Sequence, residues 1–412
     1  MCKDILCCIL DDNTSNEALK KELNLLDQPN WENLLEMSTW NGIKPLVYLR
    51  LKPLFVKATI PASIQNELRN AYLLSARKNT LILHHAAKML KTLKAHGIDL
   101  IGLKGIYLVE NIYDNIAARP FGDIDIMIKK EDLQNAITSL QKLGYRMSTY
   151  FSISDVNLDI KHVPPMINAE GLTTEIHWTI LEEDEPFTID AQGLWERASP
   201  AKIAGVDALA LSPEDLILHL CMHLTYQHRL KIGLRGLYDI AEVLRHFEGQ
   251  VNWTKLSKIT QEWGSGKVTW LTLTLAQDLL GAQIPPKILA HLQPKHIDPW
   301  VLKEAKAQLL HWGVRTVAMT PDLAELASEK KLIRQIKLIL SRVFLPKQTL
   351  ARLYGVPPRS VRIYGCYFLR FSELVRRYGG AVRRIAKKDH RVLSGTENEQ
   401  TVARLRQWMV KR

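Results

Sequence analysis

The hydrophobic period changes between residues 96 and 180, and this change constrains the fold more than any other feature of the sequence. Asp123-Ile124-Asp125-Ile126 alternates polar and apolar residues, which predicts a half-buried strand over residues 123–128. A short, mostly apolar run of strand length covers 98–103, and two further strands are expected around 160–167 and 173–180. Helix-type spacing separates them, over 106–112 and 130–143. Strands that alternate with helices in this way predict a small mixed sheet.

Helical patterns occupy the sequence on both sides of this stretch. Residues 15–95 are mostly helical in pattern, with the longest helix expected over 63–93. A second helical series begins at Ser212-Pro213, where an N-cap serine precedes a proline at the first helical position. We therefore expect an α+β fold in four segments: a helical N-terminal region (1–95), an α/β core (96–211), a helical domain (212–328) and a basic helical C-terminal extension (329–412).

Composition places the chain among ordinary globular proteins. Of 412 residues, 46% are hydrophobic and 24% are charged. No apolar run is long enough to span a bilayer, and the first residues form too short a run for a signal peptide. The five cysteines are odd in number and lack CxxC spacing, which argues against a disulfide framework. A cytoplasmic location is the default expectation.

Charge is distributed unevenly along the chain. The net charge is +12, yet residues 330–412 alone hold 21 Lys and Arg against 4 Asp and Glu. Aromatic residues are interspersed with these cations, so the extension has the composition of a surface that binds RNA or an anionic membrane. The alternative is an amphipathic helical extension whose aromatic side chains pack on the body of the protein while its charges remain solvated.

Asp123 and Asp125 are the first candidates for chemistry. Side chains two residues apart on a strand project from the same face, so the two carboxylates repel each other unless a cation lies between them. Mg²⁺ or Mn²⁺ is the natural partner, because hard divalent ions prefer oxygen ligands and also bind phosphates. The alternative is two solvent-facing acids at a sheet edge.

The turn Lys104-Gly105 joins a predicted strand to a predicted helix. Backbone N–H groups at the start of a helix favour an anion, Gly105 would allow a phosphate to approach closely, and Lys104 would offset its charge. An ordinary turn with an exposed lysine is the alternative. Arg119 is placed either to reach a phosphate or to pair with Asp123 or Asp125.

Glu175 and His177 share one face of another predicted strand, so Glu175 is a candidate third carboxylate for a two-metal site. His219 and His223 stand four residues apart on a predicted helix, where packing is favoured over zinc binding because no His-Glu-x-x-His pattern is present. Three residues of the helical domain are candidates to face a nucleotide: His223, His228 and Arg235. Asp239 either orients a ligand or caps a helix.

Taken together, these segments resemble the uncharacterised nucleotidyltransferase family of the DNA polymerase β superfamily. The resemblance rests on Leu103-Lys104-Gly105, Arg119 to Ile126, and Glu175-Ile176-His177-Trp178, and it extends into Leu211 to Asp215, His219, His223 and Leu237 to Ile240. It covers roughly residues 30–250. The wider superfamily has Gly-Ser or Gly-Gly at the phosphate turn, whereas this chain has Lys104-Gly105, a departure that bears on how the donor binds.

The resemblance implies a polymerase-β-type core and a magnesium- or manganese-dependent transferase. Asp123, Asp125 and Glu175 would be the catalytic metal ligands, while Lys104, Gly105 and Arg119 would bind the nucleotide. The enzyme would move a nucleoside monophosphate from a nucleoside triphosphate, ATP among the candidates, to a small molecule or to tRNA. Two alternatives remain: a glycosyltransferase with an Asp-x-Asp metal site, and a catalytically silent relative that binds RNA, membrane or protein through its basic extension.

Overall fold

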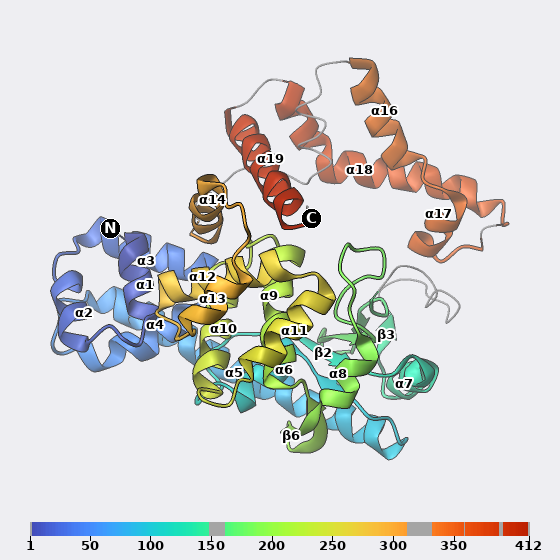
Figure 1. Cartoon of the computed structure of the whole chain (residues 1–412). Coiled ribbons are helices and arrows are strands. Elements are labelled where there is room, and N and C mark those ends of the chain that lie inside the picture. Colours follow the sequence, from blue (N-terminus) through green and yellow to red (C-terminus); the bar gives the residue numbers. More distant parts are fainter. Residues whose placement is uncertain (1, 148–160, 311–331, 358, 387–389, 411–412) are drawn as a thin grey trace. The chain divides into compact units, whose positions relative to one another are not determined.

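The computed structural model describes residues 2–147, 161–310, 332–357, 359–386 and 390–410 (Figure 1). The chain forms two compact units: Met1–Arg146 with Ile153–Gly313, and Met147–Ser152 with Val314–Arg412. Among the described residues, no helix is both long and apolar enough to cross a lipid bilayer.

The fold is α+β, as the sequence predicts, because helices surround a mixed sheet. The strands of the sheet are β1 (Ile101–Gly102), β2 (Asp123–Met127), β3 (Arg146–Met147), β4 (Met166–Ile167), β5 (Thr173–His177), β6 (Ser199–Ile203) and β7 (Val206–Ala210). Their order in the described sheet is β3-β4-β5-β2-β1-β7-β6. β2 runs parallel to β5 and antiparallel to β1, which itself runs parallel to β7. The sheet is therefore mixed, with β2 near its centre.

Helices precede and follow the sheet in the first unit. Those before or within the sheet region are α1 (Cys2–Leu10), α2 (Asn16–Leu23), α3 (Gln28–Trp40), α4 (Lys44–Leu51), α5 (Ala62–Ala95), α6 (Lys104–Asn111), α7 (Leu133–Lys142) and α8 (Ala191–Arg197). Those after it are α9 (Pro213–Cys221), a π-helix (Met222–Gln227), α10 (Leu234–His246), α11 (Trp253–Trp263), α12 (Gly266–Leu280), α13 (Pro286–Leu292) and α14 (Pro299–Leu309).

The second unit contains four described helices: α16 (Leu332–Val343), α17 (Lys347–Tyr354), α18 (Arg362–Ala386) and α19 (His390–Val410). It has a small core of its own, in which Leu350 of α17 packs against Ile363 and Cys366 of α18. The described residues of the C-terminal extension are thus mostly helical, as the sequence predicts.

The two faces of the central strands have different roles. Ile124, Ile126 and Ile176 are fully buried, and Thr174 donates a hydrogen bond to the sulfur of Met89 in α5. Side chains alternate along a strand, so the opposite face of β2 and β5 carries the polar residues at positions 123, 125, 175 and 177. One face therefore anchors the sheet to α5 and leaves the other face for chemistry.

Several predicted elements are present, some of them shorter than expected, and other elements were not predicted. The helix expected over 63–93, the strand over 123–128 and the strand over 173–180 correspond to α5, β2 and β5. The strand expected over 160–167 is short: only Met166–Ile167 is a strand, with an isolated bridge at His162 and with residue 160 outside the described residues. The hairpin β6–β7 and the π-helix have no counterpart in the prediction.

Candidate metal and nucleotide site

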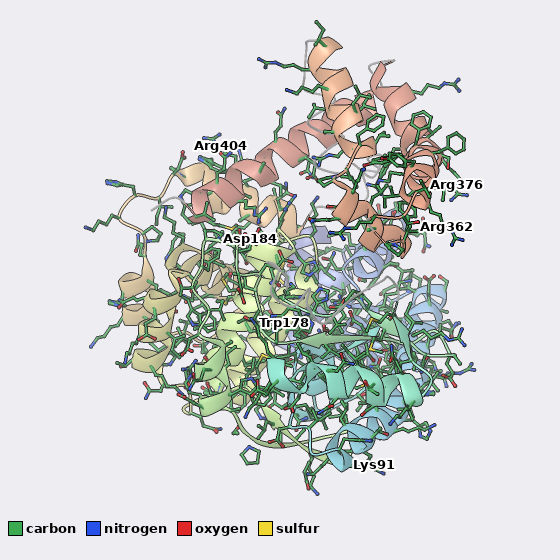
Figure 2. The ribbon with its side chains drawn as sticks, turned by 90° about the vertical axis from the view of Figure 1, so that its right-hand side faces the viewer. Lys91, Trp178, Asp184, Arg362, Arg376 and Arg404 are labelled. Atoms are coloured by element: carbon green, nitrogen blue, oxygen red, sulfur yellow. The ribbon has the colours of Figure 1, made fainter. Side chains whose placement is uncertain are left out.

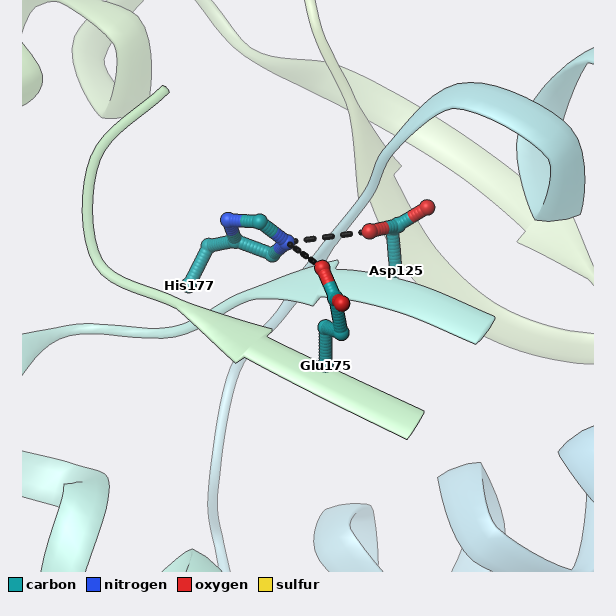
Figure 3. Close-up of side chains that lie close together, drawn as sticks. All are labelled: Asp125, Glu175 and His177. Atoms are coloured by element: carbon teal, nitrogen blue, oxygen red, sulfur yellow. Dashed lines mark hydrogen bonds and ion pairs between the residues drawn. The ribbon is translucent and has the colours of Figure 1, made fainter. Parts of the chain in front are cut away.

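The parallel pairing of β2 with β5 brings the predicted acids together. In this register Asp125 lies opposite Glu175, and His177 follows two residues later on the same face. One donor atom from each of these three side chains lies within 4.8 Å of the others. Figure 3 shows the His177 ring pointing its Nε2 atom toward both carboxylates. A group of this kind can hold a divalent metal ion.

Asp125 is the most strongly held member of the group. Its side chain is only 2% exposed, and its Oδ1 atom accepts hydrogen bonds from Lys104 Nζ at 2.9 Å and His177 Nε2 at 3.0 Å. Burial acts to raise the pKa of Asp125, but the Lys104 charge and the His177 contact outweigh burial and hold this pKa well below its ordinary value. The carboxylate is therefore ionised and available as a ligand.

Lys104 reaches Asp125 from an unusual backbone conformation. It is the first residue of α6, directly after the short strand β1, and its φ angle is +46°. A non-glycine residue in this left-handed region costs on the order of 1 kcal/mol, and such strain is typical of functional sites. The conformation directs the amine to a carboxylate, whereas a phosphate was the predicted partner. Binding of a nucleotide by Lys104 stays a prediction.

Asp123 stands apart from the three clustered side chains. It occupies the exposed first position of β2 and is not one of the three residues whose donor atoms converge. Desolvation by the surrounding protein raises the pKa of Asp123, and the charges of Asp125 and Glu175 raise it further. Those charges act on Asp123 because it borders the site, so its predicted role as a metal ligand remains open to test.

Arg119 is held by a different acid from those predicted. Its Nε and Nη2 atoms donate to the two carboxylate oxygens of Asp239 in α10, at 2.6 and 2.8 Å, and Tyr113 donates to the same carboxylate at 2.7 Å. All three residues are buried. Asp239 therefore orients the arginine, which is neither of the two roles expected from the sequence, orienting a ligand or capping a helix.

The contacts of Arg119 also explain Gly105. A Cβ atom at Gly105 would lie 2.9 Å from Arg119 Nη1 and 2.9 Å from Phe121 Cβ, so a larger residue does not fit. The guanidinium consequently lies against the Lys104-Gly105 turn, and its positive charge is close to the place where a phosphate was predicted.

Histidines of the helical layer lie near the acids. The rings of His219 and His223 are 6.0 Å apart, and those of His223 and His228 are 4.4 Å apart. Burial lowers the pKa of His219 and His223 well below the ordinary value, and the Lys104 charge lowers both further. Asp125 also acts on all three histidines, which places them around the same site.

The backbone that carries these histidines is irregular. His223 lies in the π-helix Met222–Gln227, and the residues that follow His228, Arg229 and Leu230, have φ angles of +52° and +63°. π-helical turns are rare and occur frequently at functional sites. Arg235, in the next helix, donates to the carbonyl of Pro120, which is close in sequence to Asp123. The predicted nucleotide-facing residues of the helical domain therefore border the acids.

The side chains present fit a divalent ion. Two carboxylates and one imidazole converge, one carboxylate is buried and ionised, and their oxygens are ligands that such ions accept. The two-residue strand period places His177 on this face but does not identify it as a ligand. The missing signal was its distance to Asp125, which depends on how the strands pair.

On this mixed sheet, a buried acid beside a strained lysine turn is joined by a second acid and a histidine, and the three side chains form a group that could hold a metal ion. The sequence profile described as uncharacterised nucleotidyltransferase matches residues 27–281. The chain belongs to this family.

Two further comparisons add little to this assignment. No curated protein sequence matches the chain. The crystal structure of an antigenic nucleotidyltransferase-like protein from Paracoccidioides brasiliensis is 16% identical, covers 52% of this chain and 96% of its own, and has a TM-score of 0.27. A similarity this weak supports no conclusion about the present chain.

Proposed function

We propose that this protein is a divalent-metal-dependent nucleotidyltransferase that moves a nucleoside monophosphate from a nucleoside triphosphate to a hydroxyl or phosphate acceptor. The observation that carries the proposal is the pairing of Asp125 with Glu175 across β2 and β5, with Lys104 at the start of α6 contacting the carboxylate of Asp125. Membership of the nucleotidyltransferase family supports the reaction class.

The reaction is an exchange at the α-phosphorus of the donor. An acceptor oxygen forms a bond to this phosphorus, the bond to the bridging oxygen breaks, and pyrophosphate leaves with the electron pair. A bound Mg²⁺ or Mn²⁺ supplies charge neutralisation at the phosphates. Asp125 and Glu175 hold this ion in the proposal, and Asp123 completes the site from the exposed end of β2.

The remaining side chains position the donor. Lys104 and the backbone at Gly105 contact the triphosphate, and Arg119, fixed by Asp239, contributes positive charge behind the turn. Glu175, which is less buried than Asp125, is the candidate to accept the proton of the acceptor hydroxyl.

The identity of the nucleotide donor is tested most directly by measuring which NTP binds to the protein. Thermal unfolding would be followed with each of the four NTPs, with Mg²⁺ or Mn²⁺ and without either ion, because a ligand that binds only the folded state raises the melting temperature. The preferred donor should give the largest shift, and only when an ion is present. A small-molecule acceptor and tRNA are distinguished afterwards by offering each with α-labelled donor.

Asp123→Ala is the sharpest test of activity, because Asp123 is exposed and the fold does not depend on its burial. We expect NTP turnover to fall to background while the melting temperature of the free protein stays unchanged. Asp114→Ala, at another exposed aspartate, is the matched control and should keep full activity. Undiminished turnover in Asp123→Ala would contradict the proposed site.

A second function is favoured by the surface of α18. Exposed apolar and aromatic side chains recur there at helical spacing: Tyr364, Phe368, Phe371 and Val375. Arginines accompany them, among them Arg362 and Arg376, which Figure 2 labels on this helix. A catalytically silent relative that binds an anionic partner through α18 is the alternative that this surface supports.

The two functions predict different behaviour of the acid variants. Binding of tRNA or of anionic vesicles that weakens steeply with salt, and that survives unchanged in Asp123→Ala, would support the alternative if no NTP raises the melting temperature. NTP-dependent stabilisation that requires a divalent ion would support the transferase.

A further inference from the structure

The side-chain atoms that converge on β2 and β5 include a nitrogen as well as oxygens. His177 Nε2 lies 3.0 Å from Asp125 Oδ1 and 3.4 Å from Glu175 Oε2 (Figure 3). The imidazole nitrogen therefore contacts one oxygen from each acid.

These separations match those between neighbouring ligands of one metal ion. Oxygen and nitrogen ligands lie about 2.1 Å from small divalent ions, so adjacent ligands are about 3.0 Å apart in octahedral and about 3.4 Å apart in tetrahedral geometry. The two measured distances from Nε2 are 3.0 and 3.4 Å. The three atoms can consequently surround one ion with only small movements of the side chains.

No competing contact holds the other side of the ring. His177 is 2% exposed, and its Nδ1 atom is buried without a hydrogen-bond partner among the described residues. The neighbouring buried histidine, His219, likewise has no partner for either ring nitrogen within the described part of the chain. The contacts of the His177 ring with polar atoms are thus made through Nε2, the nitrogen that faces the two acids, and no hydrogen bond at Nδ1 opposes a small shift of the ring toward an ion.

We infer that His177 is a direct metal ligand and that this site selects a first-row transition ion, such as Mn²⁺, over Mg²⁺. The inference rests on the proposed function for the presence of an ion, but not for the transfer reaction. An imidazole nitrogen is a softer donor than a carboxylate oxygen and suits transition ions, whereas Mg²⁺ demands oxygen ligands and keeps several waters. Replacing one oxygen by Nε2 therefore favours the transition ion.

Coordination of the ion by His177 can be tested by electron spin-echo spectroscopy of the full-length protein with bound Mn²⁺ and no nucleotide. A directly coordinated imidazole modulates the echo at ¹⁴N frequencies. We expect this modulation in the unaltered protein and its loss in His177→Gln, which keeps a neutral polar side chain of similar length. His162→Gln is the control, because the His162 ring lies 5.0 Å from that of His177 but its Nδ1 donates to the carbonyl of Val163.

Selectivity is measured by calorimetric titration with Mn²⁺ and with Mg²⁺ separately. The unaltered protein and His162→Gln should bind Mn²⁺ at least about 10-fold more tightly than Mg²⁺, a difference of about 1.4 kcal/mol. In His177→Gln this ratio should fall several-fold, mainly through weaker Mn²⁺ binding.

Three results would overturn the inference: no ion binding at all, no ¹⁴N modulation with Mn²⁺ bound, or an unchanged ratio in His177→Gln. Failure of the proposed function has a different signature. Nitrogen-coordinated Mn²⁺ without any effect of NTPs would leave His177 as a ligand and remove the transferase.

Discussion

Lys104 offsets the negative charge of Asp125 in the candidate site. Its amine lies 2.9 Å from the Asp125 oxygen that an ion would need, in a backbone conformation that few lysines adopt. In the proposed function the lysine and the ion compete for the same carboxylate, and the lysine becomes available to the donor phosphates only when the ion displaces it.

Lys104→Met tests this competition by removing the charge while keeping the length of the side chain. We expect a divalent ion alone to bind about 10-fold more tightly, and an NTP to bind about 10-fold more weakly, each equivalent to about 1.4 kcal/mol. Calorimetric titration of each ligand measures both effects. Lys130→Met, at an exposed lysine that pairs with Glu183, should change neither affinity; equal ion affinities in Lys104→Met and the unaltered protein would contradict the competition.

Gly105 is required by packing as well as by any phosphate. Because a Cβ atom would lie 2.9 Å from both Arg119 Nη1 and Phe121 Cβ, Gly105→Ala should destabilise the protein by about 1–3 kcal/mol. Urea unfolding measures the change. Gly266→Ala is the control: this glycine begins α12 with no atom within 4 Å of the added carbon, so the substitution should be neutral or slightly stabilising. Similar stabilities of the two variants would show that Arg119 and Phe121 move aside easily.

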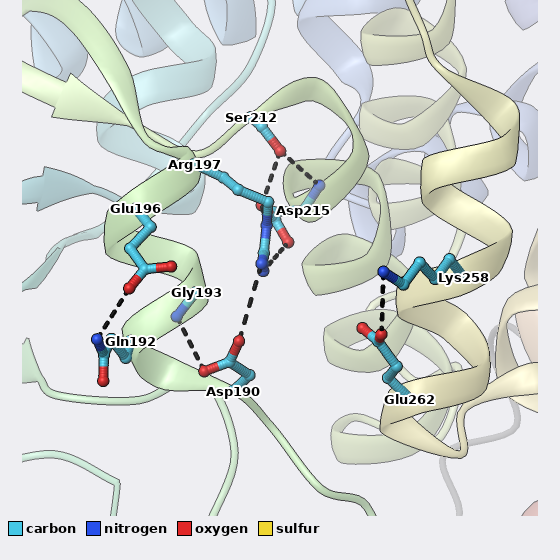
Figure 4. Close-up of polar contacts among 9 residues, drawn as sticks. All are labelled: Asp190, Gln192, Gly193, Glu196, Arg197, Ser212, Asp215, Lys258 and Glu262. Atoms are coloured by element: carbon cyan, nitrogen blue, oxygen red, sulfur yellow. Dashed lines mark hydrogen bonds and ion pairs between the residues drawn. The ribbon is translucent and has the colours of Figure 1, made fainter.

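At the scale of elements, α8 is tied to α9 by an ion pair on a fully buried acid. Arg197 donates through Nε and Nη2 to the two oxygens of Asp215, at 2.8 and 2.9 Å, and Ser212 donates to the same carboxylate (Figure 4). Ser212 also caps α9, as the sequence predicts. The strand region and the helical layer are thus joined through one carboxylate.

Arg197→Met should destabilise the protein by about 3 kcal/mol, because it leaves Asp215 buried without its cation. Lys258→Met removes the exposed pair with Glu262 in the same region, 3.8 Å between charged atoms, and should cost less than about 0.5 kcal/mol. Urea unfolding of both variants gives the comparison. A loss below 1 kcal/mol in Arg197→Met would mean that water or another group compensates Asp215.

Elements with strong local signals were predicted, and those that depend on distant partners were not. Strand alternation identified β2, apolar residues at helical spacing identified α5, and the N-cap serine followed by proline identified α9. The β6–β7 hairpin was not predicted. Its tight turn has positive φ angles at Ala204 (+51°) and Gly205 (+72°), and Ala-Gly is not one of the residue pairs that usually mark such a turn. No simple residue pattern marks a π-helix, so the segment with His223 could not be distinguished from α-helix.

For the candidate site, the residue types and the strand faces could be predicted from the sequence, whereas the partners of the charged side chains could not. The residue types and their shared faces followed from the strand period, which put Glu175 and His177 together. The partner of Arg119 could not be predicted, because Asp239 is 120 residues away in sequence and their contact depends on how α10 packs. Pairing of Lys104 with Asp125 depends on the φ angle of Lys104, which the sequence does not reveal.

For the whole molecule, buried histidines make stability depend on pH. Burial holds the pKa of His219 well below its ordinary value of 6.5, so the folded protein binds fewer protons there than the unfolded chain does. The stabilisation is complete above the unfolded pKa and is lost as the pH falls below about 6.5, by at most about 1.4 kcal/mol per pH unit for each such histidine.

His219→Leu should flatten this dependence. Urea unfolding at pH 7.5 and 5.5, with a chelator present, should show a smaller loss of stability on acidification than in the unaltered protein. His246→Leu, at an exposed histidine, should leave the loss unchanged. An identical loss in all three proteins would mean that His219 finds a proton acceptor or water when the pH falls.

The register of β2 and β5 also gives a bound ion a part in folding. A slip of one residue would turn Glu175 and His177 toward α5 and carry their neighbours to the opposite face of the sheet, so a misaligned chain would lack the three converging side chains. The ion of the proposed function would thus add its binding energy to the correctly aligned strands alone, and metal supply during synthesis would raise the yield of properly paired chains.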